Sequence, residues 1–361
     1  IMYVKLTDVK PGRVLTKDVK TPRGQIIAEE GTVLSSQLIH RMIMYKVPGI
    51  EVEEEKAVIK KAEEEDFFTD TESYRIKHSA EFQEFKNKYD DTTKNFSFKI
   101  NGFIDHLEPL DGTMILEGVN MLYAGHSTGM GTISYLMNIR NVDDSTYAHS
   151  MNVGMISRII GEWVGLPESE LDTLTLCGVL HDIGKIRIPK EVLTKPGKLT
   201  DEEYAIIKTH PELGYELLKD ADIDNKIKMA ALQHHEKKDG SGYPNKLKGD
   251  DIRMFSQIVT IADVYDAMTA DRCYRAGLCP FEVIAEMLRG KDTLYNVEYL
   301  MVFLNRMALS YVGSGVILSD DRRAKIMMIN NQDITRPLVQ LESGEFCDMM
   351  QFPSLTIKAI V

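Results

Sequence analysis

The sequence has few cysteines and no long apolar run, and each of these features excludes some classes of protein. Its four cysteines are widely spaced and form no CxxC pair, which favours reduced thiols in a cytosolic protein. No apolar run approaches the roughly 20 residues that a membrane-spanning helix needs. The first residues also lack the apolar core of a signal peptide. We therefore expect a cytoplasmic protein without a membrane anchor.

Basic residues are also fewer than acidic residues. The chain carries 43 lysines and arginines against 55 acidic residues, which gives a net charge of -12. Binding to a nucleic acid polymer needs a basic face, so this class of partner is not expected. A small anionic substrate held by metal ions is still compatible with the charge. At 361 residues, 43% hydrophobic and 27% charged, the chain is a globular protein too long for one ordinary core.

Changes of pattern divide the chain into four parts and predict a mainly α fold. Residues 1–57 contain short apolar runs cut by turn signals, which is typical of a small β-rich module. Residues 58–140 begin with a charge run and continue as a helical linker or regulatory region, whose apolar stripes fit a homodimer interface or an internal packing face equally well. Residues 141–309 alternate helical runs with short polar breaks, and residues 310–361 predict a short β tail.

The most informative stretch is His181-Asp182-Ile183-Gly184-Lys185, at the end of an apolar helical run. An imidazole beside a carboxylate can bind one metal ion, and the carboxylate has a spare oxygen for a second ion. Gly184 can end the helix, and Lys185 adds a point charge suited to phosphate.

Further candidate ligands follow from the uneven use of the nine histidines. Those at 40, 78, 106 and 126 are scattered singly and are expected to be structural or exposed, whereas five lie between His149 and His235. Adjacent rings on a helix point about 100° apart, so His234 and His235 can both face inward only at a helix end. Asp263 lies in an otherwise apolar helix, where an unpartnered carboxylate is costly, so a metal or histidine contact is expected. Asp266, one turn on, is its competitor.

Taken together, these motifs resemble the HD-GYP family, a branch of the HD metal-dependent phosphohydrolases. The resemblance covers residues 145 to about 307. It rests on His149, His181–Lys185, His210-Pro211, His234-His235-Glu236, Asp239–Pro244 and Ala262–Thr269, followed by Asp271-Arg272 and Tyr274-Arg275. It implies that residues 141–309 are an HD-type helical bundle, the catalytic domain, with small β modules on both sides.

The resemblance also implies a two-metal phosphodiesterase that hydrolyses cyclic di-GMP to linear pGpG, GMP or both. Two divalent ions are expected, with iron or manganese favoured. Some members bind a third metal through a glutamate at the position of Ser145, so two ions are favoured here, with Asp144 the alternative ligand for a third. The implied ligands of one ion are His149, His181, Asp182 and Asp263, and those of the other are His210, His234 and His235, with Asp182 bridging.

The same resemblance assigns residues to substrate. Asp182 and Lys185 are the expected catalytic residues, and Lys185 would neutralise phosphate charge or orient the nucleophile. The loop Gly242-Tyr243-Pro244 would border the cleft. Arg272 and Arg275 match positions that grip phosphate or guanine. Cys273, between them, stands where proline is common and would place a thiol near the cleft.

Two alternatives stay open. The same chemistry could act on cyclic GMP-AMP. A protein of another class, a signalling adaptor, would bind nucleotide or a GGDEF-domain partner through the GYP surface without turnover. The full set of candidate ligands argues against the adaptor.

Overall fold

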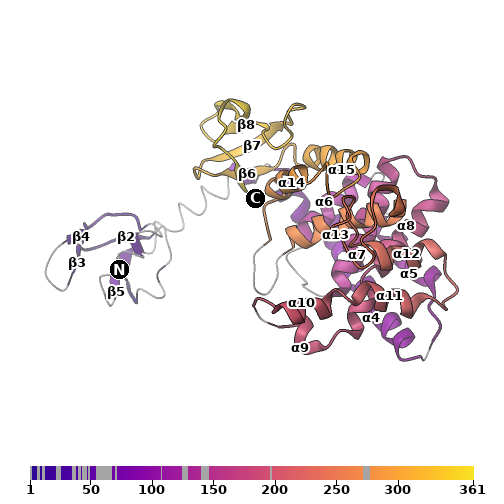
Figure 1. The fold of residues 1–361 in the computed structure, drawn as a ribbon. Coiled ribbons are helices and arrows are strands. Elements are labelled where there is room, and N and C mark those ends of the chain that lie inside the picture. Colours follow the sequence, from indigo (N-terminus) through magenta and orange to yellow (C-terminus); the bar gives the residue numbers. More distant parts are fainter. Residues whose placement is uncertain are drawn as a thin grey trace. The chain divides into compact units, whose positions relative to one another are not determined.

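The computed structural model describes two compact units, residues 1–70 and residues 71–361. Figure 1 draws both, and each is considered by itself. The described residues are 2–5, 9, 13–21, 26–34, 38–39, 42, 47, 49–53, 67–69, 71–106, 108–123, 129–139, 146–195, 197–270 and 277–361.

The first unit is built on short strands, as its turn-rich sequence predicts. A three-stranded antiparallel sheet has the order β1-β5-β2, and a separate hairpin pairs β3 with β4. Leu15, Leu34, Met42 and Val52 are fully buried in a small core of its own. The strands are β1 (Met2–Lys5), β2 (Val14–Leu15), β3 (Val19–Lys20), β4 (Ile26–Ala28) and β5 (Gly49–Glu53).

Helices dominate the second unit. The first of these, α3 to α6, are Glu72–Lys77, Ala80–Ile104, Gly112–Tyr123 and Gly129–Ile139. The next, α7 to α12, are Thr146–Trp163, Glu168–Leu180, Lys190–Leu193, Asp201–Ile207, His210–Leu218 and Asn225–Gln233. The last, α13 to α15, are Met254–Thr269, Pro280–Arg289 and Val297–Ser310, and short 3-10 turns η2, η3 and η4 cover Ile183–Arg187, Gly249–Asp251 and Met349–Gln351.

Helix α4 corrects one expectation from the sequence. The pattern suggests a helix from residue 72 to residue 88 and another from Phe96 to Leu107. In the structure, helix α3 ends before His78-Ser79, and helix α4 then runs without a break from Ala80 to Ile104. The Ser79 hydroxyl accepts a hydrogen bond from the Phe82 amide at 3.1 Å, so the N-cap sets the true start.

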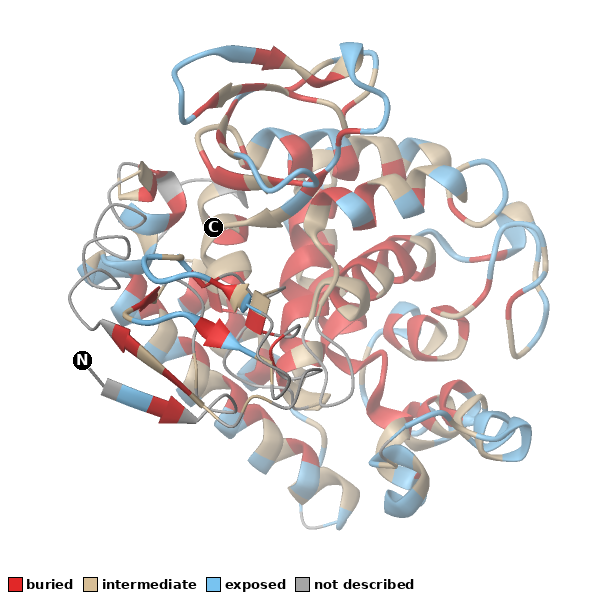
Figure 2. Cartoon of the chain, turned by 90° about the vertical axis from the view of Figure 1, so that its left-hand side faces the viewer, coloured by how far each residue is buried: buried red, intermediate tan, exposed pale blue. Residues whose placement is uncertain are grey.

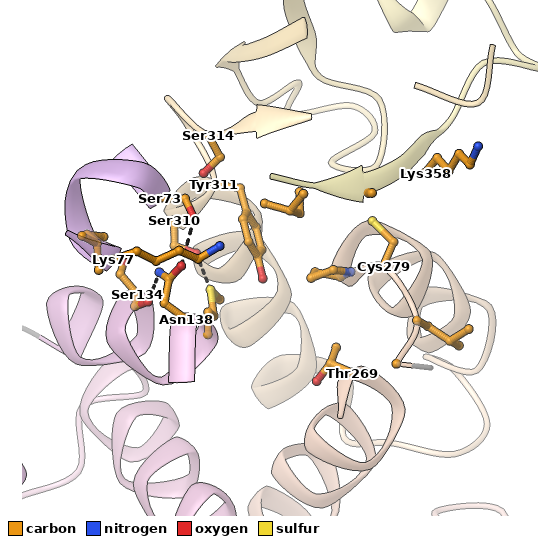
Figure 3. Close-up of a pocket in the computed structure, with 17 residues that line it drawn as sticks. Ser73, Lys77, Ser134, Asn138, Thr269, Cys279, Ser310, Tyr311, Ser314 and Lys358 are labelled. Carbon is orange, nitrogen blue, oxygen red and sulfur yellow. Dashed lines mark hydrogen bonds between the residues drawn. The ribbon is translucent and has the colours of Figure 1, made fainter. Parts of the chain in front are cut away.

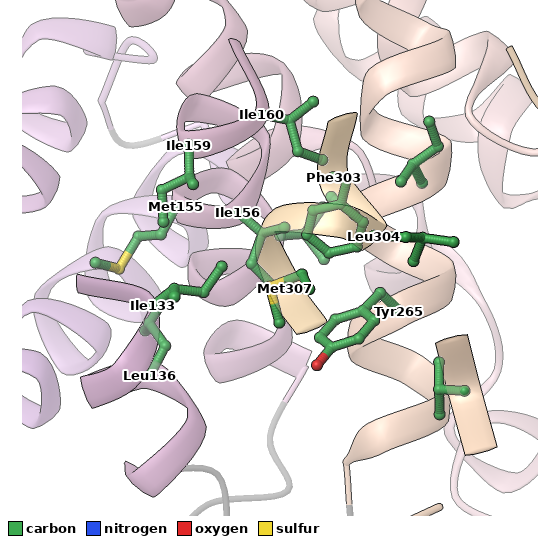
Figure 4. Packing of buried hydrophobic residues seen from close by; sticks show 14 of the residues in the cluster. Ile133, Leu136, Met155, Ile156, Ile159, Ile160, Tyr265, Phe303, Leu304 and Met307 are labelled. Atoms are coloured by element: carbon green, nitrogen blue, oxygen red, sulfur yellow. The ribbon is translucent and has the colours of Figure 1, made fainter. Parts of the chain in front are cut away.

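The core of this unit lies where α7, α8 and α13 pack together, and Figure 2 shows buried residues concentrated along its central helices. Ile156, Ile159 and Ile160 of α7 have no exposed surface. Figure 4 shows them among side chains of α6 and α15, with Phe303 opposite. Burial of this size is the main favourable term in folding, and it holds the α7 and α8 backbones in fixed positions.

The chain after α15 forms a five-stranded antiparallel sheet, which agrees with the predicted β tail. Its strand order is β10-β6-β7-β8-β9, and the predicted hairpin is β6 with β7. Val316, Ile326 and Val339 belong to the same buried cluster as the helices. The strands are β6 (Gly315–Leu318), β7 (Arg323–Met328), β8 (Leu338–Leu341), β9 (Phe346–Asp348) and β10 (Ile357–Ile360). Among the described helices, none combines the length and apolar character needed to cross a bilayer.

The close approach of α7 and α8 generates a prediction. A Cβ added at Gly178 would lie 2.6 Å from the Gly154 Cα and 2.7 Å from the Val153 carbonyl oxygen. Both obstacles are backbone, so Gly178→Ala should destabilise the second unit by about 1–3 kcal/mol. Chemical unfolding followed by circular dichroism measures the loss.

Gly102→Ala in α4 is the matched control. Its added Cβ would meet nothing closer than 3.9 Å, and alanine favours a helix, so stability should stay equal or rise. An equal loss in both variants would show that the α7–α8 contact is not the cause.

Candidate metal centre

Five segments of the second unit bring polar side chains to one buried point. His149 lies on α7, and His181 and Asp182 directly follow α8. His210 begins α11, and His234 and His235 directly follow α12. Asp263 lies on α13. The structure thus brings together the seven residues that the sequence suggests as ligands. Two groups can each hold an ion, and Asp182 belongs to both: Asp182, His210, His234 and His235 form one, and His149, His181 and Asp182 the other.

The Asp182 carboxylate lies between the two groups. Its Oδ2 is 3.3 Å from His181 Nε2 and 3.6 Å from His149 Nε2. Its Oδ1 is 3.2 Å from His210 Nε2 and 3.6 Å from His234 Nε2. Each carboxylate oxygen therefore faces a different pair of histidines, which is the geometry that one carboxylate between two cations requires.

The two aspartates of α13 contact different ring nitrogens of the centre, and the sequence alone does not decide which aspartate contacts which. Asp263 Oδ1 is 3.1 Å from His149 Nε2, and its Oδ2 is 3.9 Å from His235 Nδ1. Asp266 instead accepts a hydrogen bond from His149 Nδ1 at 2.7 Å. Asp266 therefore orients the His149 ring and leaves Nε2 facing the centre, a positioning role that the sequence analysis missed.

The rings of His210 and His234 show that the centre suits a cation. His210 Nδ1 lies 2.6 Å from the Ile207 carbonyl oxygen, and His234 Nδ1 lies 3.0 Å from the Ala231 carbonyl oxygen. A carbonyl can only accept, so both Nδ1 atoms carry hydrogen, and Nε2 is the ring nitrogen left to bind another group. These two Nε2 atoms are 3.1 Å apart. Two ring nitrogens this close need a shared cation between them, either a proton or a metal ion.

His181 repeats this arrangement on the other side. Its Nδ1 lies 2.6 Å from the Gly178 carbonyl oxygen, which leaves Nε2 facing Asp182. Neither His181 Nε2 nor Asp182 Oδ1 makes a hydrogen bond within the part of the chain that the structure describes, although both are fully buried. Buried polar atoms of this kind need a partner. A metal ion fits both.

The electrostatics differ between the two sides. Burial lowers the pKa of His181, but the carboxylates of Asp182 and Asp263 outweigh it and raise that pKa to about 10. On the other side, burial lowers the pKa of His234 to about 4 and that of His235 well below its usual value. The carboxylate side therefore attracts positive charge, and the histidine side offers the neutral imidazoles that metals bind.

The residues of the centre differ in exposure. The His235 side chain is 25% exposed, and that of His149 is 12% exposed, whereas Asp182 is 1% exposed. Tyr243 stacks on His235, with ring centroids 4.7 Å apart. Lys185, which is also partly exposed, donates a hydrogen bond to Asp182 Oδ2. A substrate would therefore approach past these side chains.

The Gly242-Tyr243-Pro244 loop is held against the centre by Glu236. This buried carboxylate accepts hydrogen bonds from the Asn245 amide at 2.6 Å and the Leu247 amide at 2.9 Å. A Cβ at Gly242 would lie 2.5 Å from the His235 carbonyl oxygen, so only glycine lets the loop pack this closely. The sequence analysis gave Glu236 no role. The available signal was a carboxylate beside a glycine-rich loop, whose amides need acceptors.

Comparison with known families identifies this region. A model of the HD domain family matches residues 136–298, which include every residue of the centre. Residues 136–298 therefore resemble an HD domain. This confirms the family expected from the motifs and the mainly helical fold with β elements at both ends. An HD domain implies bound divalent metal, and the cluster of histidines and aspartates supplies its donors.

Three curated relatives are similar to part of this chain. A cyclic di-GMP phosphodiesterase of Pseudomonas aeruginosa is 31% identical over 57% of this chain and 50% of its own length. The cyclic di-GMP phosphodiesterase response regulator RpfG of Xanthomonas campestris is 42% identical over 43% of this chain and 41% of its own. The 3'3'-cGAMP-specific phosphodiesterase 2 of Vibrio cholerae is 35% identical over 56% and 41%. The chain thus spans half or less of each relative.

Part of the predicted site lies outside the described residues. Arg272, Cys273 and Arg275 follow α13 in segment 271–276, and Asp144 and Ser145 precede α7 in segment 140–145. Their assignments therefore stay predictions.

The junction of η2 with α11 in the HD domain generates a second prediction. A Cβ at Gly184 would lie 2.0 Å from the His210 carbonyl oxygen and 2.5 Å from the Gly214 amide nitrogen. Gly184→Ala should therefore displace His210 from Asp182 and weaken metal affinity by roughly 10–100-fold. Metal content after dialysis, measured by mass spectrometry, gives the result.

Gly214→Ala alters the same contact from the other side and is the control. Its Cβ would meet its nearest neighbour, the Gly184 nitrogen, at 3.4 Å, which is an ordinary contact, so metal content should be kept. Full metal retention in Gly184→Ala would contradict the dependence of the centre on this junction.

Proposed function

We propose that this chain is a metal-dependent phosphodiesterase that hydrolyses cyclic di-GMP to linear pGpG, GMP or both. The observation that carries the proposal is the position of Asp182, whose two oxygens face separate pairs of histidines. Relatives named as cyclic di-GMP phosphodiesterases are 31–42% identical to this chain over 43–57% of its length, which supports the substrate.

The proposed ligand sets follow the two groups around Asp182. Mixed nitrogen and oxygen donors suit iron or manganese, and Ser145 favours two ions rather than three. Bound metals would lower the pKa of a coordinated water and neutralise phosphate charge. One ion would be held by His149, His181, Asp182 and Asp263, and the other by His210, His234 and His235 together with Asp182.

The accessible side of the centre suggests how the chain's own residues would treat a cyclic dinucleotide. Lys185 donates to Asp182 and so fixes that carboxylate, while its charge lies where a phosphodiester would approach. Burial raises the pKa of the Tyr243 hydroxyl, so it stays protonated and can donate to the substrate. Gly242 and Pro244 shape the loop that carries it. Lys185 and Asp182 are the proposed catalytic residues.

The remaining substrate contacts are assigned to Arg272 and Arg275. Both follow α13, the helix of Asp263, in the sequence. A guanidinium can bind phosphate through two parallel hydrogen bonds or stack on guanine, which suits either part of the substrate.

Cyclic GMP-AMP is the second candidate substrate, because a relative specific for it is 35% identical over 56% of this chain. The rival adaptor role, with a GGDEF-domain partner on the GYP loop, is disfavoured by the complete set of metal donors.

A cytoplasmic location belongs to the same proposal and is supported by cysteines that form no CxxC pair. A homodimer through the helices before residue 140 is compatible with it.

Turnover tests the proposal directly. Protein purified without oxygen should hydrolyse cyclic di-GMP, and chromatography should separate pGpG from GMP, with cyclic GMP-AMP assayed in parallel. His181→Ala should reduce turnover to background because it removes a proposed ligand.

His78→Ala is the matched control for this assay. His78 stacks on Tyr74 outside the centre, so its variant should keep full activity. Wild-type protein that holds two metals and yet turns over neither substrate would contradict the enzyme and favour the adaptor.

Arg272 permits a separate prediction. Arg272→Ala should raise KM for cyclic di-GMP by about tenfold or more, because a charge-assisted hydrogen bond to phosphate would be lost. Its metal content should not change. Steady-state kinetics with metal analysis make the comparison, and an unchanged KM would remove Arg272 from the site.

A further inference from the structure

The second unit contains a cavity of about 270 Å³ to which none of the seven metal-centre residues contributes. Its walls come from α3, α6, the end of α13, the start of α14, the end of α15 and β10, and Figure 3 shows these elements around it. Thr269, in the wall, ends the helix that carries Asp263. The function proposed above gives this cavity no role.

The charged residues of the cavity wall indicate the charge of the ligand that would bind there. Lys77 and Lys358 line the cavity, and the described lining contains no aspartate or glutamate, although acidic residues outnumber basic ones in the chain. Lys358 Nζ is already 2.7 Å from Asp321 Oδ1. Within the described residues no carboxylate pairs with Lys77, and Figure 3 shows its side chain reaching into the cavity. Lys77 is therefore the cation available to a ligand.

A serine hydroxyl in the wall faces the same cavity. Ser314 is 5% exposed, and its Oγ makes no hydrogen bond within the described part of the chain. Figure 3 shows this hydroxyl directed into the cavity. Two neighbouring serines differ: Ser73 Oγ donates to Asn138 Oδ1 at 2.9 Å, and Ser310 Oγ donates to the Met307 carbonyl oxygen at 2.7 Å. The Ser314 hydroxyl is therefore free to exchange a hydrogen bond with a bound molecule.

The remaining wall and the volume define the ligand further. Met137, Leu278 and Ile360 give one part of the cavity an apolar surface. The volume lies just below the range of roughly 300–1,000 Å³ typical of sites for drug-sized molecules. We propose that this cavity binds a small organic anion, with its acidic group at Lys77, a polar atom at Ser314 and its apolar body on Met137, Leu278 and Ile360.

Cys279 allows a direct test of occupancy, because it is a free cysteine in the cavity wall. Labelling by methyl methanethiosulfonate, quantified on the peptide that contains Cys279, would report whether the cavity is filled. Benzoate and phenyl phosphate are the probes and distinguish a carboxylate from a phosphate group. Benzamide is the neutral control.

We expect at least one of the two anions to protect Cys279, and benzamide to protect it far less. Lys77→Met should weaken that protection by about tenfold or more, through loss of a charge-assisted contact. Ser314→Ala should weaken it less. Lys99→Met, at an exposed lysine that pairs with Glu108, should leave it unchanged. Unfolding midpoints of all variants separate lost binding from lost folding.

Three results would overturn the proposal: no protection by either anion, equal protection by benzamide, or full protection in a folded Lys77→Met protein. His181→Ala should retain the protection, since the cavity is separate from the metal centre. Because the readout is binding, failure here is distinguishable from failure of the proposed phosphodiesterase.

Discussion

The structure around the metal centre depends on one buried carboxylate, that of Asp182. An isolated carboxylate in a protein interior costs several kcal/mol unless other groups compensate it. Here His149, His181, His210 and His234 bring ring nitrogens to its two oxygens, and Lys185 donates to it as well. The ends of α8 and α12, the start of α11 and the body of α7 must therefore converge on this group.

Close backbone packing makes that convergence feasible. Gly178 lets α8 lie against α7, and Gly184 lets η2 lie against the start of α11. Backbone carbonyls at these contacts then fix the rings, as Gly178 does for His181 and Ile207 does for His210. Folding and site geometry are thus coupled: the same contacts that bury the core direct each Nε2 toward Asp182.

Much of this could be predicted from the sequence, because the informative patterns are local. The His181-Asp182 pair, the adjacent His234 and His235 at a helix end, and Asp263 within an apolar run each carry their own signal. Helical periodicity also indicated the mainly α body, and turn signals indicated the β6–β7 hairpin.

What the sequence missed depends on side-chain direction in three dimensions. Asp263 and Asp266 lie one turn apart on α13, and only the packing of α7 decides that Asp266 meets His149 Nδ1. The hydrogen bonds that Glu236 accepts from the amides of the loop after it depend likewise on the loop's path, which no periodic pattern encodes. The start of helix α4 was missed because it depends on one N-cap residue, Ser79.

The central claim is that Asp182 joins two metal sites. Metal stoichiometry of three proteins, purified without oxygen and measured by mass spectrometry, tests it most directly. The account predicts two ions per chain in the wild type, about one in Asp263→Ala, whose side chain lies with the His149 and His181 group, and almost none in Asp182→Ala. An Asp182→Ala protein that is folded and retains one or more ions per chain would contradict the shared carboxylate.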